Sequence, residues 1–168
     1  MAIVCKQAWA AVLLGAAVGA ALAAPLRQLV LERDETSVSG LSSGGFMAVQ
    51  LHVAYSGTFK RGAGIVAGGP FYCAENSIVN ATGRCMTHSS SIPLTGLVNT
   101  TRNWAASGSV DPVANLGAAK VYLFSGTRDS TVVPAVMNDL DSYYRNFVAG
   151  ANIRYRNDVA AEHAMVTD

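Results

Sequence analysis

Gly40-Leu41-Ser42-Ser43-Gly44 lies where the sequence predicts a short strand over residues 36–41 to turn directly into an apolar helix over residues 43–55. A strand that turns this sharply into a helix holds the central serine in a strained backbone conformation, and flanking glycines avoid side-chain collisions. We therefore expect Ser42 to present its hydroxyl outside the turn. A serine in an ordinary glycine-rich turn is the alternative interpretation.

Two further apolar runs predict strands inside a sheet. Residues 63–67 are bounded by glycines, and residues 121–124 run into a turn over residues 125–129, so that Asp129 follows the end of a strand. Between these strands, residues 71–117 are rich in Ser, Thr, Asn, Gly and Pro. This composition predicts loops, apart from a short helix around residues 102–106.

The C-terminal part of the chain predicts a helix followed by an edge strand. Pro134 suits a first helical turn, and Gly150 is expected to end the helix. The apolar face of this helix has helical spacing and consists of Met137, Leu140, Tyr144 and Phe147. Residues 153–156 alternate apolar side chains with arginines, which is typical of a half-exposed strand near a sheet edge.

Strands that alternate with helices predict an α/β fold with a mainly parallel sheet. Loops after the carboxyl ends of such strands meet at one edge of the sheet, and Ser42, Asp129 and His163 each follow a predicted strand. Their order along the chain is the nucleophile, acid and base order of α/β-hydrolases. We therefore expect the three side chains to meet.

These three residue types belong together chemically. A serine hydroxyl is a weak nucleophile, so acyl transfer needs an imidazole to take its proton and a carboxylate to orient that imidazole. Asp129 as a turn-capping aspartate and His163 as a surface histidine are the alternatives. His52 lies on the predicted buried helix, and His88 precedes Asp129, so neither histidine fits the base position as well as His163.

The N-terminal residues have the three parts of a secretory signal peptide. Lys6 precedes an uncharged apolar stretch over residues 8–22, and Ala21-Leu22-Ala23 has the small residues of a cleavage site. A membrane anchor is the alternative, but a bilayer span needs about 20 apolar residues. We expect cleavage after residue 23, which leaves residues 24–168 as one α/β-hydrolase-like catalytic domain that is exported to the periplasm or the cell exterior.

Composition excludes some partners. Charged residues make up 14% of the chain and the formal net charge is +1, which gives no field to attract nucleic acid or anionic lipid. After signal cleavage we expect no stable membrane span. No phosphate-binding glycine loop with a lysine is present, so no cofactor is predicted.

Cys73 and Cys85 are the two cysteines that remain after residue 23. In an oxidising compartment they predict a local disulfide, worth about 3 kcal/mol by loop-closure entropy. Two free thiols are the alternative. A metal site is not predicted, because His88 is the only neighbouring ligand and structural zinc usually needs four.

A longer string, Gly-Leu-Ser-Ser-Gly-Gly-Phe-Met-Ala-Val-Gln-Leu over residues 40–51, resembles the secreted poly(3-hydroxybutyrate) depolymerases, and so do residues 64–74. The segments around Asp129, with Val132-Val133-Pro134, and around Glu162-His163-Ala164 are similar to the acid and base segments of that family. The resemblance runs from about Ser37 to the last residue, so it covers nearly all of the chain that remains after residue 23.

The resemblance implies a serine esterase that hydrolyses poly- or oligo-3-hydroxybutyrate through an acyl-enzyme. Ser42 would be the nucleophile, His163 the base and Asp129 the acid, and the backbone N–H of Ser43 would donate to the oxyanion. It also implies a circularly permuted α/β-hydrolase. Family members continue beyond the catalytic histidine, so we expect this chain to be a fragment.

Two alternatives to this function stay open. A secreted esterase that releases feruloyl or acetyl groups from polysaccharide would use the same serine turn. An inactive remnant or secreted binding module of the same fold would keep the three residues without a working site.

Overall fold

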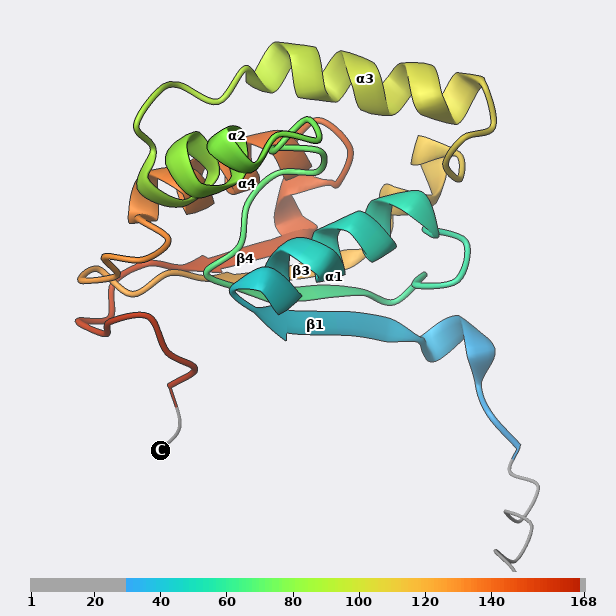
Figure 1. The fold of residues 1–168 in the computed structure, drawn as a ribbon. Helices are drawn as coiled ribbons and strands as arrows, with labels where there is room; N and C mark the ends of the chain where they lie inside the picture. Colours follow the sequence, from blue (N-terminus) through green and yellow to red (C-terminus); the bar gives the residue numbers. More distant parts are fainter. Residues whose placement is uncertain (1–29, 167–168) are drawn as a thin grey trace, which may run out of the picture. The chain divides into compact units, whose positions relative to one another are not determined.

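The sheet consists of four parallel strands whose order in space follows their order in the sequence (Figure 1). They are β1 (Ser37–Leu41), β2 (Gly62–Val66), β3 (Lys120–Phe124) and β4 (Ile153–Arg156). This computed structural model describes residues 30–166. The predicted α/β class with a parallel sheet is confirmed, whereas the predicted signal peptide at residues 1–23 lies outside the described residues.

Helices cover one face of this sheet, as Figure 1 shows. They are α1 (Ser43–Ala54), α2 (Ile78–Thr82), α3 (Leu94–Ala106) and α4 (Pro134–Tyr144). Parallel strands added in one direction by right-handed crossovers keep their connecting helices on the same side. Short helical turns lie at Arg33–Glu35, Gly83–Thr87, Val113–Leu116 and Gly150–Asn152. The opposite face of the sheet exposes Ser37, Ser39, Lys120, Tyr122 and Arg154.

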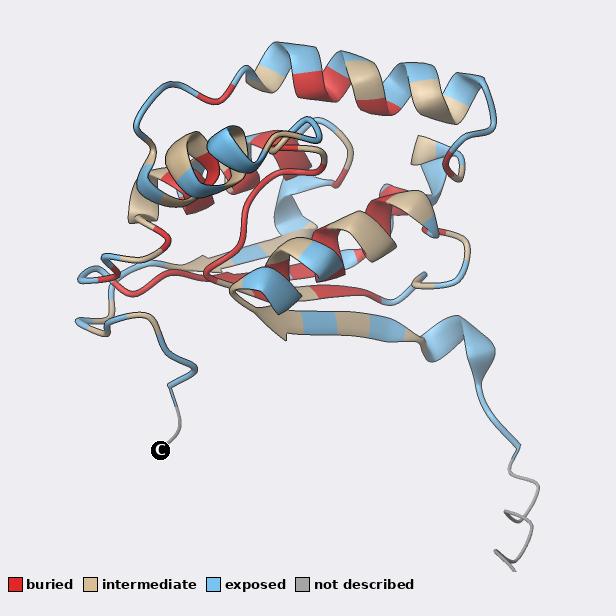
Figure 2. Cartoon of the chain, viewed as in Figure 1, coloured by how far each residue is buried: buried red, intermediate tan, exposed pale blue. Residues whose placement is uncertain are grey.

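The core lies between the sheet and its helices, where Figure 2 shows most of the buried segments. Alternate strand residues supply one side of this core, because successive side chains of a strand point to opposite faces. Ile65 and Leu123 are fully buried on the sheet side, and Val49, Val136 and Leu140 are fully buried on the helix side. Burial of such side chains removes about 1.5–3 kcal/mol of unfavourable hydration for each.

Three sequence expectations about the elements need correction. Residues 71–117 hold the long helix α3 as well as α2. The prediction missed them because the loop-rich composition concealed the buried face of α3, which consists of Leu97, Val98 and Thr101. The helix α4 ends at Tyr144 rather than at Gly150, which begins a separate turn. The helix α1 is not buried all round, since Met47 is 56% exposed.

Within residues 30–166, no helix is both long enough and apolar enough to span a bilayer.

A buried polar network joins α1 to α3 and α4. The Nδ1 atom of His52 and the hydroxyl of Tyr144 share a hydrogen bond of 3.0 Å, and both side chains are fully buried. The hydroxyls of Thr101 and Tyr143 share another of 2.7 Å. Burial lowers the pKa of His52 to about 4 and raises the pKa of Tyr143 and Tyr144. The network is therefore neutral around pH 7.

Acidification should weaken the fold through His52. The folded pKa of about 4 lies below the unfolded value of 6.5, so the unfolded chain binds the proton first as the pH falls. The contribution of neutral His52 to the free energy of unfolding is complete above pH 6.5. It is lost progressively toward pH 4, by roughly 3 kcal/mol in total. Urea unfolding at several pH values, compared between wild type and His52→Gln, measures this contribution. An equal pH dependence in the variant would contradict it.

Candidate active site

Ser42 occupies a sharp turn between β1 and α1. Its φ of 59° and ψ of −125° lie in a region that non-glycine residues rarely adopt. Two backbone hydrogen bonds hold it there, because its N–H donates to Val66 O at 3.0 Å and its carbonyl accepts from Phe46 N at 2.9 Å. The strained turn predicted from the sequence is therefore present, and Ser42 stands at the carboxyl end of β1.

Only one of the two motif glycines around this serine is in close contact with other backbone atoms. A Cβ on Gly40 would lie 2.1 Å from Gly44 O, so a side chain is excluded there. A Cβ on Gly44 would meet nothing within 4 Å. The other close approach is at Gly45, where a Cβ would lie 2.9 Å from Val66 O of β2. The expectation that both motif glycines avoid collisions is thus correct for Gly40 and wrong for Gly44.

Asp129 and His163 form a pair at the ends of the neighbouring strands. The Nδ1 atom of His163 lies 2.9 Å from Oδ2 and 3.1 Å from Oδ1 of Asp129. The Asp129 side chain is 1% exposed, and Oδ1 also accepts from the N–H groups of Thr131 and Val132, both at 2.9 Å. These bonds fix the carboxylate. An imidazole that donates from Nδ1 to a carboxylate keeps Nε2 as its basic nitrogen.

Backbone pairing brings His163 to Asp129 across a long stretch of sequence. The N–H groups of Ser125, Thr127 and Arg128 donate to the carbonyls of Arg156, Val159 and Ala161, at 2.9, 2.8 and 3.0 Å. Gly126 makes this approach possible, because a Cβ there would lie 2.2 Å from Ala161 O. The segment before His163 is therefore held against the turn that carries Asp129.

The three sequence-predicted residues are not all joined by hydrogen bonds. Among residues 30–166, hydrogen bonds connect His163 to Asp129 but none connects Ser42 to His163. Ser43 is the first residue of α1, and N–H groups in a first helical turn lack partners within the helix. Such a donor next to Ser42 suits a developing oxyanion.

An apolar cleft opens beside Ser42, with a volume of about 630 Å³. One wall comes from α1, and the other comes from the segment that the disulfide closes. Its lining includes Ser42, Ser43, Phe46, Met47, Gln50, Tyr72, Ile78, Met86 and Val132. Phe46 and Met47 belong to the predicted apolar helix, and neither Gln50 nor Tyr72 was predicted to be a site residue. The pair of cysteines and the resemblance over residues 64–74 were the sequence signals for this wall.

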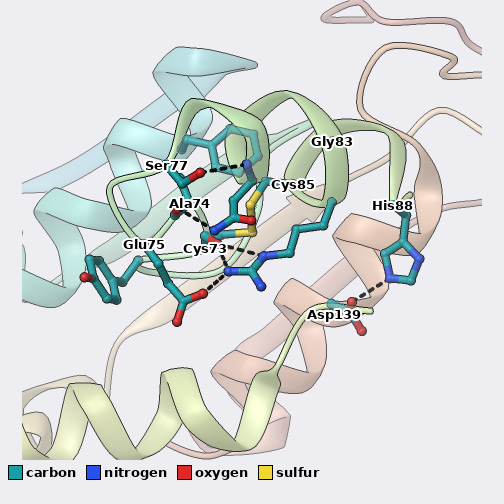
Figure 3. Close-up of a disulfide and its surroundings, with 12 residues drawn as sticks. Cys73, Ala74, Glu75, Ser77, Gly83, Cys85, His88 and Asp139 are labelled. Atoms are coloured by element: carbon teal, nitrogen blue, oxygen red, sulfur yellow. Dashed lines mark hydrogen bonds and ion pairs between the residues drawn. A yellow bond between two sulfur atoms is a disulfide. The ribbon is translucent and has the colours of Figure 1, made fainter. Parts of the chain in front are cut away.

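The predicted disulfide between Cys73 and Cys85 is present, and both cysteines line the cleft. In the same region His88, which the sequence analysis set aside as a base, pairs through Nε2 with Oδ2 of Asp139 at 2.9 Å (Figure 3). This pair ties the end of the disulfide segment to α4. Among residues 30–166, no three or more His, Cys, Asp or Glu side chains gather as metal ligands.

The parallel sheet, the helices on its face and the strand-to-helix turn at Ser42 define the α/β-hydrolase class of fold. Comparison of sequences then identifies relatives. The chain is 65% identical over 143 residues to a poly(3-hydroxybutyrate) depolymerase of Delftia acidovorans and 42% identical over 163 residues to a polyhydroxybutyrate depolymerase of Talaromyces funiculosus. The chain is thus a sequence relative of poly(3-hydroxybutyrate) depolymerases along most of its own length. No protein-family model matches the sequence.

Solved structures of PHB depolymerases are also similar to this chain. A PHB depolymerase from Penicillium funiculosum and a PHB depolymerase in complex with an R3HB trimer each superpose with a TM-score of 0.70 and 40% identity. Each match covers 78% of this chain and 40% of the other. The sequence matches cover 85% and 97% of this chain but 29% and 46% of the two relatives. The chain thus spans less than half the length of the proteins it matches.

Alanine at the two motif glycines should separate their roles. We expect Gly40→Ala to lower the free energy of unfolding by about 2–3 kcal/mol, because its Cβ would collide with backbone at Gly44. Gly44→Ala should leave stability unchanged or raise it by about 0.5–1 kcal/mol, since alanine favours a helix. Urea unfolding measures both. Equal effects of the two substitutions would disprove the assignment of the close contact to Gly40.

Proposed function

We propose that this chain forms the catalytic part of an exported serine esterase that hydrolyses ester bonds of poly- or oligo-3-hydroxybutyrate. The observation that carries the proposal is the hydrogen-bonded pair of Asp129 and His163. This pair follows the carboxyl ends of β3 and β4, and Ser42 follows the carboxyl end of the parallel strand β1. The apolar cleft beside Ser42 suits an aliphatic ester. The names of the relatives supply the substrate class.

In the proposed mechanism, Ser42 Oγ attacks the ester carbonyl carbon while its proton passes to Nε2 of His163. The tetrahedral oxyanion accepts a hydrogen bond from the Ser43 N–H. The C–O bond to the leaving alcohol breaks as Nε2 returns the proton to that oxygen, which leaves an acyl-enzyme on Ser42. Water then gives a proton to Nε2 and attacks the acyl carbon. The bond from that carbon to Ser42 Oγ breaks as Nε2 returns the proton to Oγ, which releases the acid and restores the free serine.

Asp129 has an orienting role in this scheme. Its carboxylate holds the Nδ1–H of His163 and stabilises the imidazolium that forms after proton transfer. The hydrogen bonds from Thr131 and Val132 to Oδ1 keep the carboxylate fixed while His163 changes its protonation state. No metal or cofactor is needed for these steps.

Export and processing are part of the same proposal. The signal peptide at residues 1–23 would direct the chain out of the cytoplasm, and residues 24–168 would form one domain. A disulfide between Cys73 and Cys85 fits an oxidising compartment, where such bonds persist. A polymeric substrate outside the cell also fits an exported enzyme.

Substitution at Ser42 and Asp129 tests the catalytic assignment. We expect Ser42→Ala to abolish ester hydrolysis and labelling by a fluorophosphonate, because both need the Oγ nucleophile. Asp129→Asn should lower kcat by about ten-thousandfold, because the amide favours the wrong tautomer of His163. Ser39→Ala is the control, since Ser39 is an exposed residue of β1. Unchanged hydrolysis by Ser42→Ala disproves the mechanism, and a folded wild type without labelling supports the inactive remnant.

A substrate comparison tests the ester class. Oligomers of 3-hydroxybutyrate should be hydrolysed with a kcat/KM at least about tenfold above that for feruloyl or acetyl sugar esters, because the cleft walls are mainly apolar. Release of free acid, followed by titration at constant pH, measures all substrates in the same way. A preference for feruloyl or acetyl sugar esters would replace the polyester assignment with that of a polysaccharide esterase.

A further inference from the structure

The wall of the cleft opposite α1 contains an unusual run of backbone conformations. Tyr72, Glu75 and Asn76 have φ values of 58°, 47° and 60°, although none is glycine. A left-handed backbone is tolerated by asparagine but is a clear outlier for a bulky residue such as tyrosine. Strained residues of this kind persist only where the surrounding structure holds them, and they gather at functional sites.

Two sets of bonds join residues within this wall of the cleft. The disulfide between Cys73 and Cys85 closes the segment. The guanidinium of Arg84 donates from Nη2 to Cys73 O at 3.1 Å and forms an ion pair with Glu75. Figure 3 shows Glu75 turned toward this guanidinium beside the disulfide. These bonds lie within the wall, and none of them reaches α1.

Gln50 supplies a link between the two walls. Its Oε1 accepts a hydrogen bond of 3.3 Å from the N–H of Tyr72, the first of the left-handed residues. The ring of Tyr72 packs on Trp104 with centroids 4.8 Å apart, so its other side is supported by α3. Gln50 lies on α1, the helix that begins directly after Ser42, and it lines the cleft.

We infer that Gln50 is a positioning residue that fixes the width of the apolar cleft beside Ser42 and so sets the size of the side group that an ester substrate carries there. The inference rests on the proposed function of Ser42. Without the acceptor of Gln50, the N–H of Tyr72 loses its partner on α1, so the wall can shift away from the helix at this point. A wider cleft favours longer alkyl groups.

Binding of two matched trimers tests this inference. Trimers of 3-hydroxybutyrate and 3-hydroxyhexanoate have the same ester backbone and differ only in a methyl or propyl side group. Calorimetry in the Ser42→Ala background gives the ratio of their Kd values without hydrolysis. We expect Gln50→Met to shift this ratio about fivefold toward the hexanoate trimer, the value of one net hydrogen bond. The same shift should appear in KM of the Ser42 chain, with kcat for the butyrate trimer changed less than about twofold.

Variants of matched size separate this role from a general loss of stability. Gln50→Glu keeps an acceptor for Tyr72 N and should keep the wild-type ratio within about twofold, whereas Gln50→Met keeps length but has no strong acceptor. If Gln50→Met fails to fold, Gln50→Asn, whose shorter side chain does not reach Tyr72, should give the same shift. Asn103→Met removes an exposed amide from α3 and should leave the ratio unchanged.

The outcomes distinguish this inference from the proposed function. A ratio that does not change in Gln50→Met, or that changes equally in Gln50→Glu, overturns the positioning role. Failure of both trimers to bind the folded Ser42→Ala chain also overturns it. If the trimers bind with a ratio that depends on Gln50 but the Ser42 chain hydrolyses neither, the positioning role stands and the esterase proposal falls.

Discussion

Backbone hydrogen bonds between the turn after β3 and the segment after β4 determine where the imidazole of His163 lies. A loop histidine has no helix or strand of its own to fix it, so its place depends on the paired backbone just before it. The pairing needs a residue without a side chain at Gly126, because a Cβ there would collide with the carbonyl of Ala161. Asp129 lies on one of these segments and His163 follows the other, so their side chains meet.

The helix α1 contacts the serine turn, the sheet, the cleft and the core through different residues along its length. Its first turn follows the strained Ser42, and Gly45 lets it approach β2 closely. Farther along, Gln50 faces the cleft and His52 faces the core, where it meets Tyr144 of α4. One rigid element thus connects the serine turn, the cleft wall and the core, so displacement of this helix would affect all three.

Strain at the candidate site is distributed over two separate places. Ser42 is held by hydrogen bonds to β2 and within α1. The left-handed residues of the opposite wall are held by a disulfide, an arginine and the side chain of Gln50. Because strained conformations persist only when neighbours hold them, these bonds contribute to the shape of the cleft.

The sequence by itself determined the strand-to-helix turn at Ser42, the α/β class, the cysteine pair and, within residues 30–166, the position of residues 153–156 as an outer strand of the sheet. These features rest on local signals, such as the period of apolar residues and glycines beside a serine. The catalytic roles of Ser42, Asp129 and His163 stay predictions. Only the tertiary structure decided which motif glycine is in close contact, that Gln50 reaches Tyr72, and that Met47 faces a cleft instead of the core. Such contacts join residues far apart in sequence, so they depend on how whole elements pack and not on the residues beside them in the chain.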